Sequence, residues 1–256
     1  MSTIKTCRIL GVNIAVTNMA QTVQYIENNL EKLRGKYICV SNVHTTVMAY
    51  RDTTIMAHDN PAYRNVQNSA AIALPDGKPL SVVSRKRGYT EAERVTGPDL
   101  MGELFARKNG LKHFFYGDKE ETLQILQQKL KEKYPDIQIA GMISPPFRSL
   151  SREEEKAYIQ QINDSGADIV WIGLGAPKQE NWMFEHQGML HGVMIGVGAG
   201  FSYHAGLIKR APKWMQRMSL EWFYRLMQDP VRLFKRYFTT NLKFMLLEAK
   251  DKGEAL

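Results

Sequence analysis

A glycine-rich segment at residues 173–180 carries residue types that bind phosphate. It reads Gly-Leu-Gly-Ala-Pro-Lys-Gln-Glu and joins a buried apolar run to a helical pattern. The first backbone N–H groups of a helix lack partners within the helix, and the helix dipole favours negative charge there. Lys178 adds a positive charge beside those groups. The spacing matches neither a Walker A loop nor a complete GxGxxG fingerprint, so a tight turn without a ligand remains the alternative.

Asp76 is the second chemical candidate, in the sequence Leu-Pro-Asp-Gly that stops a short apolar run. A carboxylate at the end of a strand can take a proton from a substrate hydroxyl as a general base. Pro-Asp-Gly is also a common turn sequence in which the Asp side chain hydrogen-bonds its own backbone. From these residues alone the turn interpretation is favoured.

The histidines and cysteines predict neither a metal site nor nucleophilic hydrolysis. No HExxH pattern, Cys/His ligand spacing, DxD or GxSxG is present. Cys7 and Cys39 lie in apolar, strand-like surroundings and are predicted to be buried thiols. We expect no metal and no cofactor. The six histidines are His44, His58, His113, His186, His191 and His204.

Alternating strand and helix patterns must position these candidates. Asp118, with Glu121 three residues later, predicts a capping box that starts a helix. The alternation predicts an α/β fold, with a mostly parallel sheet covered by helices on both faces. Such sheets bind ligands at the carboxyl ends of their strands, where Asp76 falls. The predicted strands are residues 8–12, 37–40, 71–74, 113–116, 137–143, 168–174 and 192–197, and the predicted helices include 18–33, much of 44–69 with a break at 60–61, 118–133 and a stretch through 182.

Positive charge is concentrated near the C-terminus. From Phe201 onward, eleven basic and five acidic residues leave a net charge of +6, out of +8 for all 256 residues. The preceding part has the weak charge of an ordinary soluble domain. The basic tail is therefore predicted to be a separate functional region.

A helix is predicted from Pro230, with Asp229 as its N-cap, to about residue 249. Its basic side chains lie on one side and its apolar ones on the other, which favours an anionic lipid surface. A helix packed on its own domain with a solvated basic face is an equal alternative, and nucleic acid is disfavoured because no nucleic-acid-binding motif accompanies the charge. The basic side holds Arg232, Arg236 and Lys243, and the apolar side Phe234, Tyr237, Phe238, Leu242 and Met245.

Any contact with a membrane is predicted to be peripheral. No apolar run approaches the roughly 20 residues that span a bilayer. The first ten residues, MSTIKTCRIL, lack the apolar stretch of a signal peptide. We therefore expect a cytoplasmic protein on the inner face of the cell membrane.

Four segments, taken in order, carry a resemblance to a known family. They are residues 74–80 (LPDGKPL), 94–100 (RVTGPDL), 173–180 (GLGAPKQE), and 210–216 (RAPKWMQ) running into 220–226 (LEWFYRL) and 229–232 (DPVR). With this ordered set, the chain resembles the WecG/TagA/CpsF family of bacterial glycosyltransferases over about residues 10–243.

The resemblance implies an inverting, membrane-associated enzyme with a Rossmann-like domain and a C-terminal helical appendage. Such enzymes move a sugar, often N-acetylmannosamine, from a UDP-sugar to a polyprenyl-diphosphate-linked sugar. They assemble wall teichoic acid, enterobacterial common antigen, capsule or exopolysaccharide. The implied partners are thus the UDP-sugar donor, the lipid-linked acceptor and an anionic membrane surface.

The resemblance also implies roles for individual residues. Asp76 matches the catalytic base, Gln179 a polar active-site residue, and Arg225 and Arg232 basic appendage residues that close over the site and meet diphosphate. Further substrate-binding residues are then expected at Ser41, Asn42, Arg94, Thr96, Gly97, Gly173, Gly175, Lys178, Glu180, Ser202 and Lys235.

Two positions depart from the family pattern. Many relatives have Thr two residues before the Asn at the end of the second strand, where this chain has Val40, with Ser41 as the nearest hydroxyl. The Phe-Asp that often follows the glycine-rich strand is Phe201-Ser202 here. The second change bears on how the donor is held, so the donor sugar stays open.

The sequence predicts a catalytic domain at residues 1–207 and an appendage at 208–256. A non-catalytic nucleotide-binding membrane scaffold is the rival prediction. A nicotinamide-dependent oxidoreductase is disfavoured because GxGxxG and a following acidic residue are missing. An exposed apolar tail can equally bury itself in a second copy of the chain, so a homo-oligomer stays open.

Overall fold

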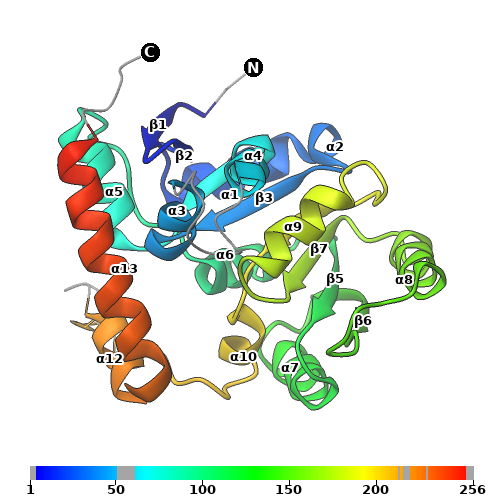
Figure 1. Ribbon diagram of the computed structural model, residues 1–256. Coiled ribbons are helices and arrows are strands. Elements are labelled where there is room, and N and C mark those ends of the chain that lie inside the picture. The colour runs from blue at the N-terminus through cyan, green and yellow to red at the C-terminus, as the bar shows by residue number, and fades with distance from the viewer. Residues whose placement is uncertain (1–3, 51–60, 213, 216–219, 229, 252–256) are drawn as a thin grey trace.

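The computed structural model describes residues 4–50, 61–212, 214–215, 220–228 and 230–251. Its centre is one eight-stranded sheet in the order β1-β2-β4-β3-β8-β7-β5-β6 (Figure 1). Only β1 and β2 pair antiparallel, and every other neighbouring pair is parallel. The predicted mostly parallel α/β sheet is confirmed. The strands are β1 Thr6–Ile9, β2 Val12–Ala15, β3 Tyr37–Ser41, β4 Ile72–Pro75, β5 Lys112–Gly117, β6 Gln138–Ile143, β7 Ile169–Gly173 and β8 Val193–Gly196.

The N-terminal strand prediction is wrong. Residues 8–12 were expected to form one strand, but β1 and β2 form a hairpin whose two-residue turn is Leu10-Gly11. Both turn residues have positive φ, 47° and 81°, as a tight hairpin turn requires. Leucine rarely adopts this conformation, so Leu10-Gly11 is a weak turn signal.

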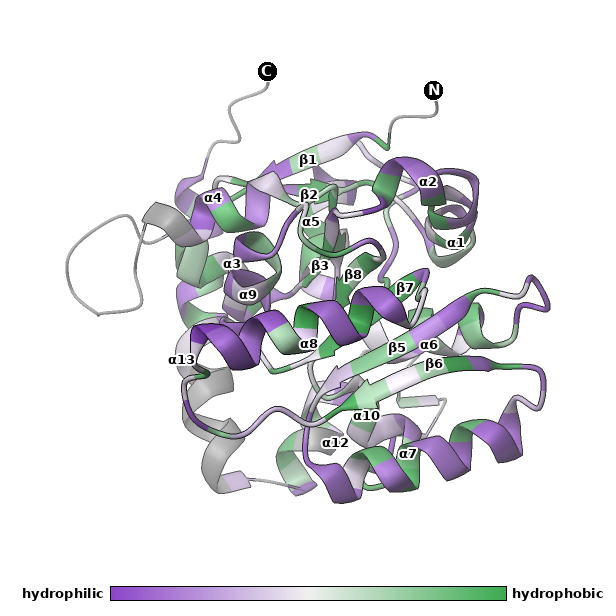
Figure 2. Cartoon of the chain, turned by 90° about the vertical axis from the view of Figure 1, so that its right-hand side faces the viewer, coloured by the Kyte–Doolittle hydropathy of each residue, from purple (hydrophilic) through white to green (hydrophobic). Residues whose placement is uncertain are grey.

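One face of the sheet is covered by α3 (Val43–Tyr50), α4 (Pro61–Ser69), α5 (Lys78–Lys86), α8 (Arg152–Asp164) and α9 (Lys178–Glu185). The other face is covered by α1 (Met19–Asn28), α2 (Leu30–Leu33), α6 (Gly97–Phe105), α7 (Glu120–Lys133) and α10 (Gly200–His204). Successive β7 residues alternate between the two cores: Val170 lies in the first and Trp171 in the second. The outward faces of α7 and α8 are hydrophilic (Figure 2).

The start of α7 differs from the predicted capping box. Lys119, rather than Asp118, occupies the N-cap position. Asp118 has a φ of 59°, and its carboxylate accepts hydrogen bonds from the Lys119 N–H at 2.8 Å and the Ser202 hydroxyl at 3.0 Å. Asp118 therefore lies at the carboxyl end of β5, where its side chain connects β5 to α10, instead of capping a helix.

The C-terminal region forms α12 (Glu221–Gln228) and α13 (Pro230–Lys250), which confirms a helix that starts at Pro230. Asp229, its predicted N-cap, lies outside the described residues, as do the side chains of 231–238. α13 packs against α3 (Figure 1) and buries Phe244 there. Leu242, Met245 and Leu246 remain exposed. None of the described helices is long and apolar enough to cross a bilayer.

Candidate active site

Strand order places the predicted site residues along one edge of the sheet. Chain connections run from β3 outward to β4 and from β5 outward to β6, on opposite sides of β8 and β7. A reversal of this kind leaves a crevice at the carboxyl ends of the strands, the usual ligand site of such sheets. Segments 41–42, 75–76, 117–118, 173–178 and 196–202 follow those carboxyl ends.

Asp76 follows β4 directly and is held by backbone hydrogen bonds. Its N–H donates to the Ser41 carbonyl at 2.7 Å, and the neighbouring Pro75 carbonyl accepts from the Val95 N–H at 2.9 Å. Gly77, with a φ of 104°, turns the chain into α5. These contacts fix the backbone of Asp76 between the end of β3 and the loop that precedes α6.

Asn42 shapes the adjoining turn. Its side-chain oxygen accepts from the His44 N–H at 2.9 Å and the Thr45 N–H at 3.2 Å, while Ser41 is buried and donates its hydroxyl to Gln67 at 2.6 Å. In this structure Asn42 thus holds the first turn of α3, and the Ser41 side chain lies in the protein interior.

The glycine-rich segment forms a turn between β7 and α9. A side chain at Gly173 would place its Cβ 2.7 Å from the Phe201 ring, so Phe201 requires glycine there. Gly175 has a φ of 77°, and its carbonyl accepts from the Gln179 N–H at 2.9 Å. Lys178 is exposed at the first position of α9. This is the arrangement of helix N-terminus and lysine that the sequence predicted for phosphate.

Gln179 and Glu180 point into the protein beside that turn. The Gln179 side-chain oxygen accepts from the Gly198 N–H at 3.0 Å, and its Nε2 donates to Glu180 at 2.8 Å. Gln179 is 4% exposed and Glu180 1%. Burial raises the pKa of Glu180, although hydrogen bonds from Gln179, its own backbone N–H and Tyr63 act in the other direction.

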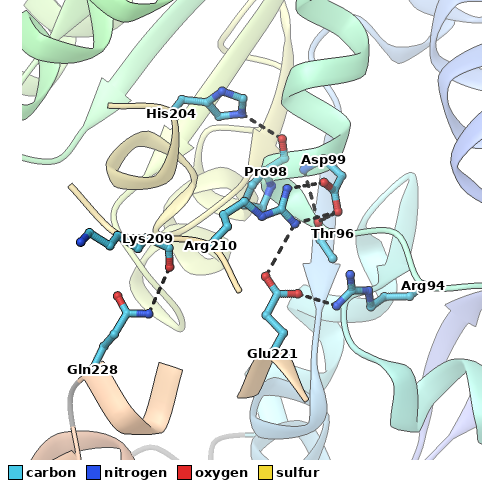
Figure 3. A network of polar contacts seen from close by, with 9 residues as sticks. All are labelled: Arg94, Thr96, Pro98, Asp99, His204, Lys209, Arg210, Glu221 and Gln228. Carbon is cyan, nitrogen blue, oxygen red and sulfur yellow. Dashed lines mark hydrogen bonds and ion pairs between the residues drawn. The ribbon is translucent and has the colours of Figure 1, made fainter. Parts of the chain in front are cut away.

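Arg94 and Thr96 belong to a polar network that ties the α/β domain to the appendage (Figure 3). Arg94 pairs with Glu221 of α12 at 2.7 Å, and Glu221 lies 3.6 Å from Arg210. Arg210 also pairs with Asp99, which accepts from the Thr96 hydroxyl at 2.6 Å. Two of the four recognised segments, residues 94–100 and the one that begins at 210, therefore meet in one network.

The same network lowers the pKa of Asp99 and caps the start of α6. Burial alone would raise the pKa of Asp99, but hydrogen bonds from Arg210 and Thr96 outweigh it, so the pKa lies below its ordinary value. Thr96 caps α6 by accepting from the Asp99 N–H at 3.2 Å. At Gly97 a Cβ would lie 3.3 Å from Val197, so glycine lets α6 approach the turn after β8 closely.

The remaining predicted residues are on the appendage and on α10. Arg225 is in α12, and Arg232 and Lys235 are in α13, but their side chains lie outside the described part of the chain. Ser202 is in α10 and donates to Asp118. No cluster of three or more potential metal ligands occurs within the described ranges.

Sequence reasoning did not identify several residues of this region. Asp99, Arg210 and Glu221 stood inside recognised segments, but the Asp99–Arg210 and Arg94–Glu221 pairs each span more than one hundred residues. Tyr63 and Gln67 bring a hydroxyl and an amide from α4 to Glu180 and Ser41. Their spacing of four, which places both on one helix face, was the only available signal.

A family model described as "Glycosyl transferase WecG/TagA/CpsF family" matches residues 7–255. The chain belongs to this family. Membership confirms the resemblance found in the sequence and makes the protein a glycosyltransferase, a hexosyltransferase by class. It favours the transferase prediction over the scaffold alternative.

Two relatives of this WecG/TagA/CpsF chain carry the same name, N-acetylglucosaminyldiphosphoundecaprenol N-acetyl-beta-D-mannosaminyltransferase. The protein from Bacillus subtilis (strain 168) is 30% identical over 220 residues, covering 84% of this chain and 81% of the relative. The protein from Staphylococcus aureus (strain MW2) is 28% identical over 247 residues, covering 95% and 93%. Both similarities extend over most of the two chains compared.

Proposed function

We propose that this glycosyltransferase moves a sugar from a UDP-sugar to a polyprenyl-diphosphate-linked sugar, and that N-acetylmannosamine is the first candidate for the sugar moved. The product would serve assembly of a cell-surface polysaccharide or teichoic acid. The names of the two relatives support the acceptor class and the sugar. The observation that carries the proposal is the placement of Asp76 and the N-terminus of α9 along one sheet edge.

The reaction needs a base on one side of the transferred sugar and a cationic site on the other. Asp76 follows β4, and α9 begins after β7, three strands away, or about 14 Å along the edge. In the proposed single displacement, Asp76 takes the proton of the acceptor hydroxyl. The hydroxyl oxygen then bonds to the anomeric carbon as the bond to UDP breaks, which inverts that carbon.

The negative charge on the departing diphosphate would be met by fixed positive groups. The N-terminal end of α9, which carries the positive end of the helix dipole, and the Lys178 ammonium follow the end of β7. Arg225 and Arg232, in the appendage helices, are proposed to add charge-assisted hydrogen bonds. Gln179, whose side-chain oxygen accepts from the Gly198 N–H at 3.0 Å, is proposed to shape the site at that turn.

The appendage, proposed here as residues 208–256, would bring the enzyme to its lipid-linked acceptor. Large apolar side chains are exposed on it, including Trp214 at 59% and Met227 at 69%. The same region carries most of the chain's net positive charge. Exposed aromatic and apolar groups with basic charge favour an anionic lipid interface. We infer a peripheral location on the inner face of the membrane.

The test is incubation of the full chain with a panel of UDP-sugars and a short-chain polyprenyl-diphosphate-GlcNAc acceptor. We expect UDP release and a product whose mass increases by one sugar, with one donor preferred. UDP binding without product from any donor would contradict the proposal. For the membrane part, Trp222→Ser combined with Met227→Ser should lower sedimentation with anionic vesicles, while the exposed Met189→Ser control, on the α/β domain, should not.

A further inference from the structure

A chain of buried polar side chains connects the end of β3 to the turn after β8. Ser41 donates to Gln67 at 2.6 Å, and Gln67 donates to the Tyr63 hydroxyl at 3.1 Å. Tyr63 donates to Glu180 at 3.3 Å, and Glu180 accepts from Gln179 at 2.8 Å. We call these five residues the buried polar chain.

Both ends of the buried polar chain meet backbone that shapes the proposed site. At one end, the Ser41 carbonyl accepts the Asp76 N–H at 2.7 Å. At the other end, Gln179 accepts the Gly198 N–H at 3.0 Å. The buried polar chain thus extends from the proposed base to the turn after β8, through α4 and α9.

The burial of these five polar side chains suggests a role other than stability. Each member is at most 4% exposed. Buried polar groups cost free energy unless they are hydrogen-bonded, and apolar groups of the same shape can serve stability equally well. Fully connected buried networks instead favour one unique geometry.

The Gln179 amide also fits closely against the turn that it holds. A Cβ at Gly196 would lie 3.0 Å from Gln179 Nε2, and Gly198 has a φ of 53°. A larger residue at Gly196 would collide with the amide. Rotation of that amide would likewise release the Gly198 N–H, so the Gln179 orientation and the turn depend on each other.

We propose that Gln67, Tyr63 and Glu180 are positioning residues for sugar transfer. They fix the Gln179 amide and the Gly198 turn relative to Asp76, without contacting substrate themselves. This inference rests on the proposed function, because it concerns the geometry of the same site.

The first test compares Tyr63→Phe with Tyr37→Phe. Both tyrosines are buried, and both hydroxyls form a hydrogen bond with a residue of α4. The Tyr63 hydroxyl accepts from Gln67, inside the buried polar chain, whereas the Tyr37 hydroxyl donates to the Val66 carbonyl, outside it. Tyr63→Phe should lower kcat roughly 10- to 100-fold with little change in the donor KM, because small displacements of reacting groups have effects of that size. Tyr37→Phe should lower thermal stability and retain kcat. Equal kcat losses in both variants, or full kcat in Tyr63→Phe, would overturn the proposal.

The second test uses Glu180 and includes a measurement that needs no substrate. Glu180→Gln retains an oxygen that can accept from Gln179, whereas Glu180→Leu removes it. We expect Glu180→Gln to retain a higher kcat than Glu180→Leu. We also expect hydrogen exchange of a peptide covering residues 196–201 to become faster in Glu180→Leu than in Glu180→Gln. Unchanged exchange in both folded variants would overturn the positioning role. If Glu180→Leu fails to fold, Tyr63→Phe must show the faster exchange, and normal exchange there would overturn it.

The two proposals fail in distinguishable ways. Wild-type protein that yields no product would contradict the proposed function, and the exchange of residues 196–201 would still decide whether the buried polar chain holds the turn. Wild-type turnover with normal kcat in Tyr63→Phe would contradict the positioning role alone.

Discussion

Around the crevice, side chains are buried and linked by hydrogen bonds, whereas α12 and α13 join the α/β domain through partly exposed ion pairs. Gln179 and Glu180 are at most 4% exposed. By contrast, the side chains of the Arg94–Glu221 pair are 25% and 14% exposed, and those of Arg87–Glu248 are 20% and 22% exposed. Salt screens partly exposed pairs much more than buried hydrogen bonds. The comparison indicates a rigid sheet edge at the proposed site, and helices α12 and α13 whose attachment responds to ionic conditions.

The largest effect is expected from Asp76→Asn, which removes the proposed base while retaining the size of the side chain. Transfer should fall about 10²- to 10⁴-fold, because a general base contributes that much. UDP binding, measured by calorimetry, should change little. Asp168→Asn is the matched control: it also changes a carboxylate beside a strand, but at the opposite edge of the sheet, where Asp168 pairs with Arg34. If both variants transfer sugar at the wild-type rate, Asp76 is not the base.

Gly173→Ala tests the close packing of the edge. The new Cβ would lie 2.7 Å from the Phe201 ring, which is fully buried and can move little. Overpacking of this kind should lower the free energy of unfolding by about 1–3 kcal/mol, measured by urea denaturation. Gly102→Ala is the control, because its Cβ would approach the Tyr134 hydroxyl at 3.3 Å, the end of a side chain. An unchanged urea midpoint for Gly173→Ala would contradict the tight contact.

Glu221→Gln tests the attachment of the appendage beside the site. The amide leaves Arg94 and Arg210 without their shared carboxylate. Turnover should fall roughly three- to tenfold, since a partly exposed pair contributes about 1 kcal/mol. Turnover of the variant should also depend less on salt than that of the wild type.

Glu248→Gln provides the comparison, near the C-terminal end of α13. It breaks the pair with Arg87, which lies at 2.8 Å, and should affect stability more than turnover. Equal losses of turnover in the two variants would mean that the pairs act only by holding α13 in place.

Glu180→Gln should change the pH dependence of stability. The pKa of Glu180 is raised above 4.5 by burial, so the folded chain holds this proton where the unfolded chain has released it. The free energy of unfolding therefore falls as pH rises from about the unfolded value through the raised folded value. Tyr37, Cys39 and Tyr63 face this carboxylate, and burial raises the pKa of each, so none ionises in that window.

The variant removes that titration, so its melting temperature relative to wild type should increase as pH rises through the window. Thermal melts at several pH values measure this difference. A constant difference at all pH values would contradict the raised pKa.

The fold was predictable from local patterns because each parallel strand is a short apolar run followed by a turn. Strands β3 to β8 lie within a few residues of their predicted bounds. The N-terminal hairpin was missed because its turn contains Leu10 at positive φ. Asp118 was misinterpreted because Asp followed by Glu three residues later is typical of a capping box, whereas its actual partner, Ser202, is 84 residues away.

The site was predictable only in outline. Asp76 and the turn at residues 173–178 follow strand ends, and parallel strands bring such ends to one edge. The contacts of Ser41 and Glu180 were not predictable, because both side chains turn inward to partners on α4. Likewise, Asp99, Arg210 and Glu221 are acidic and basic residues common on any surface, and their pairing appears only once the fold brings Arg210 to Asp99 and to Glu221 of α12.

The anomeric configuration of the transferred sugar tests the account most directly. In one NMR experiment on the purified product, the one-bond coupling constant between the anomeric carbon and its proton is compared with that of the UDP-sugar, because this coupling differs between the two anomers. Single displacement, with Asp76 deprotonating the acceptor hydroxyl, predicts the opposite configuration in donor and product. The same configuration in both would contradict the proposed mechanism.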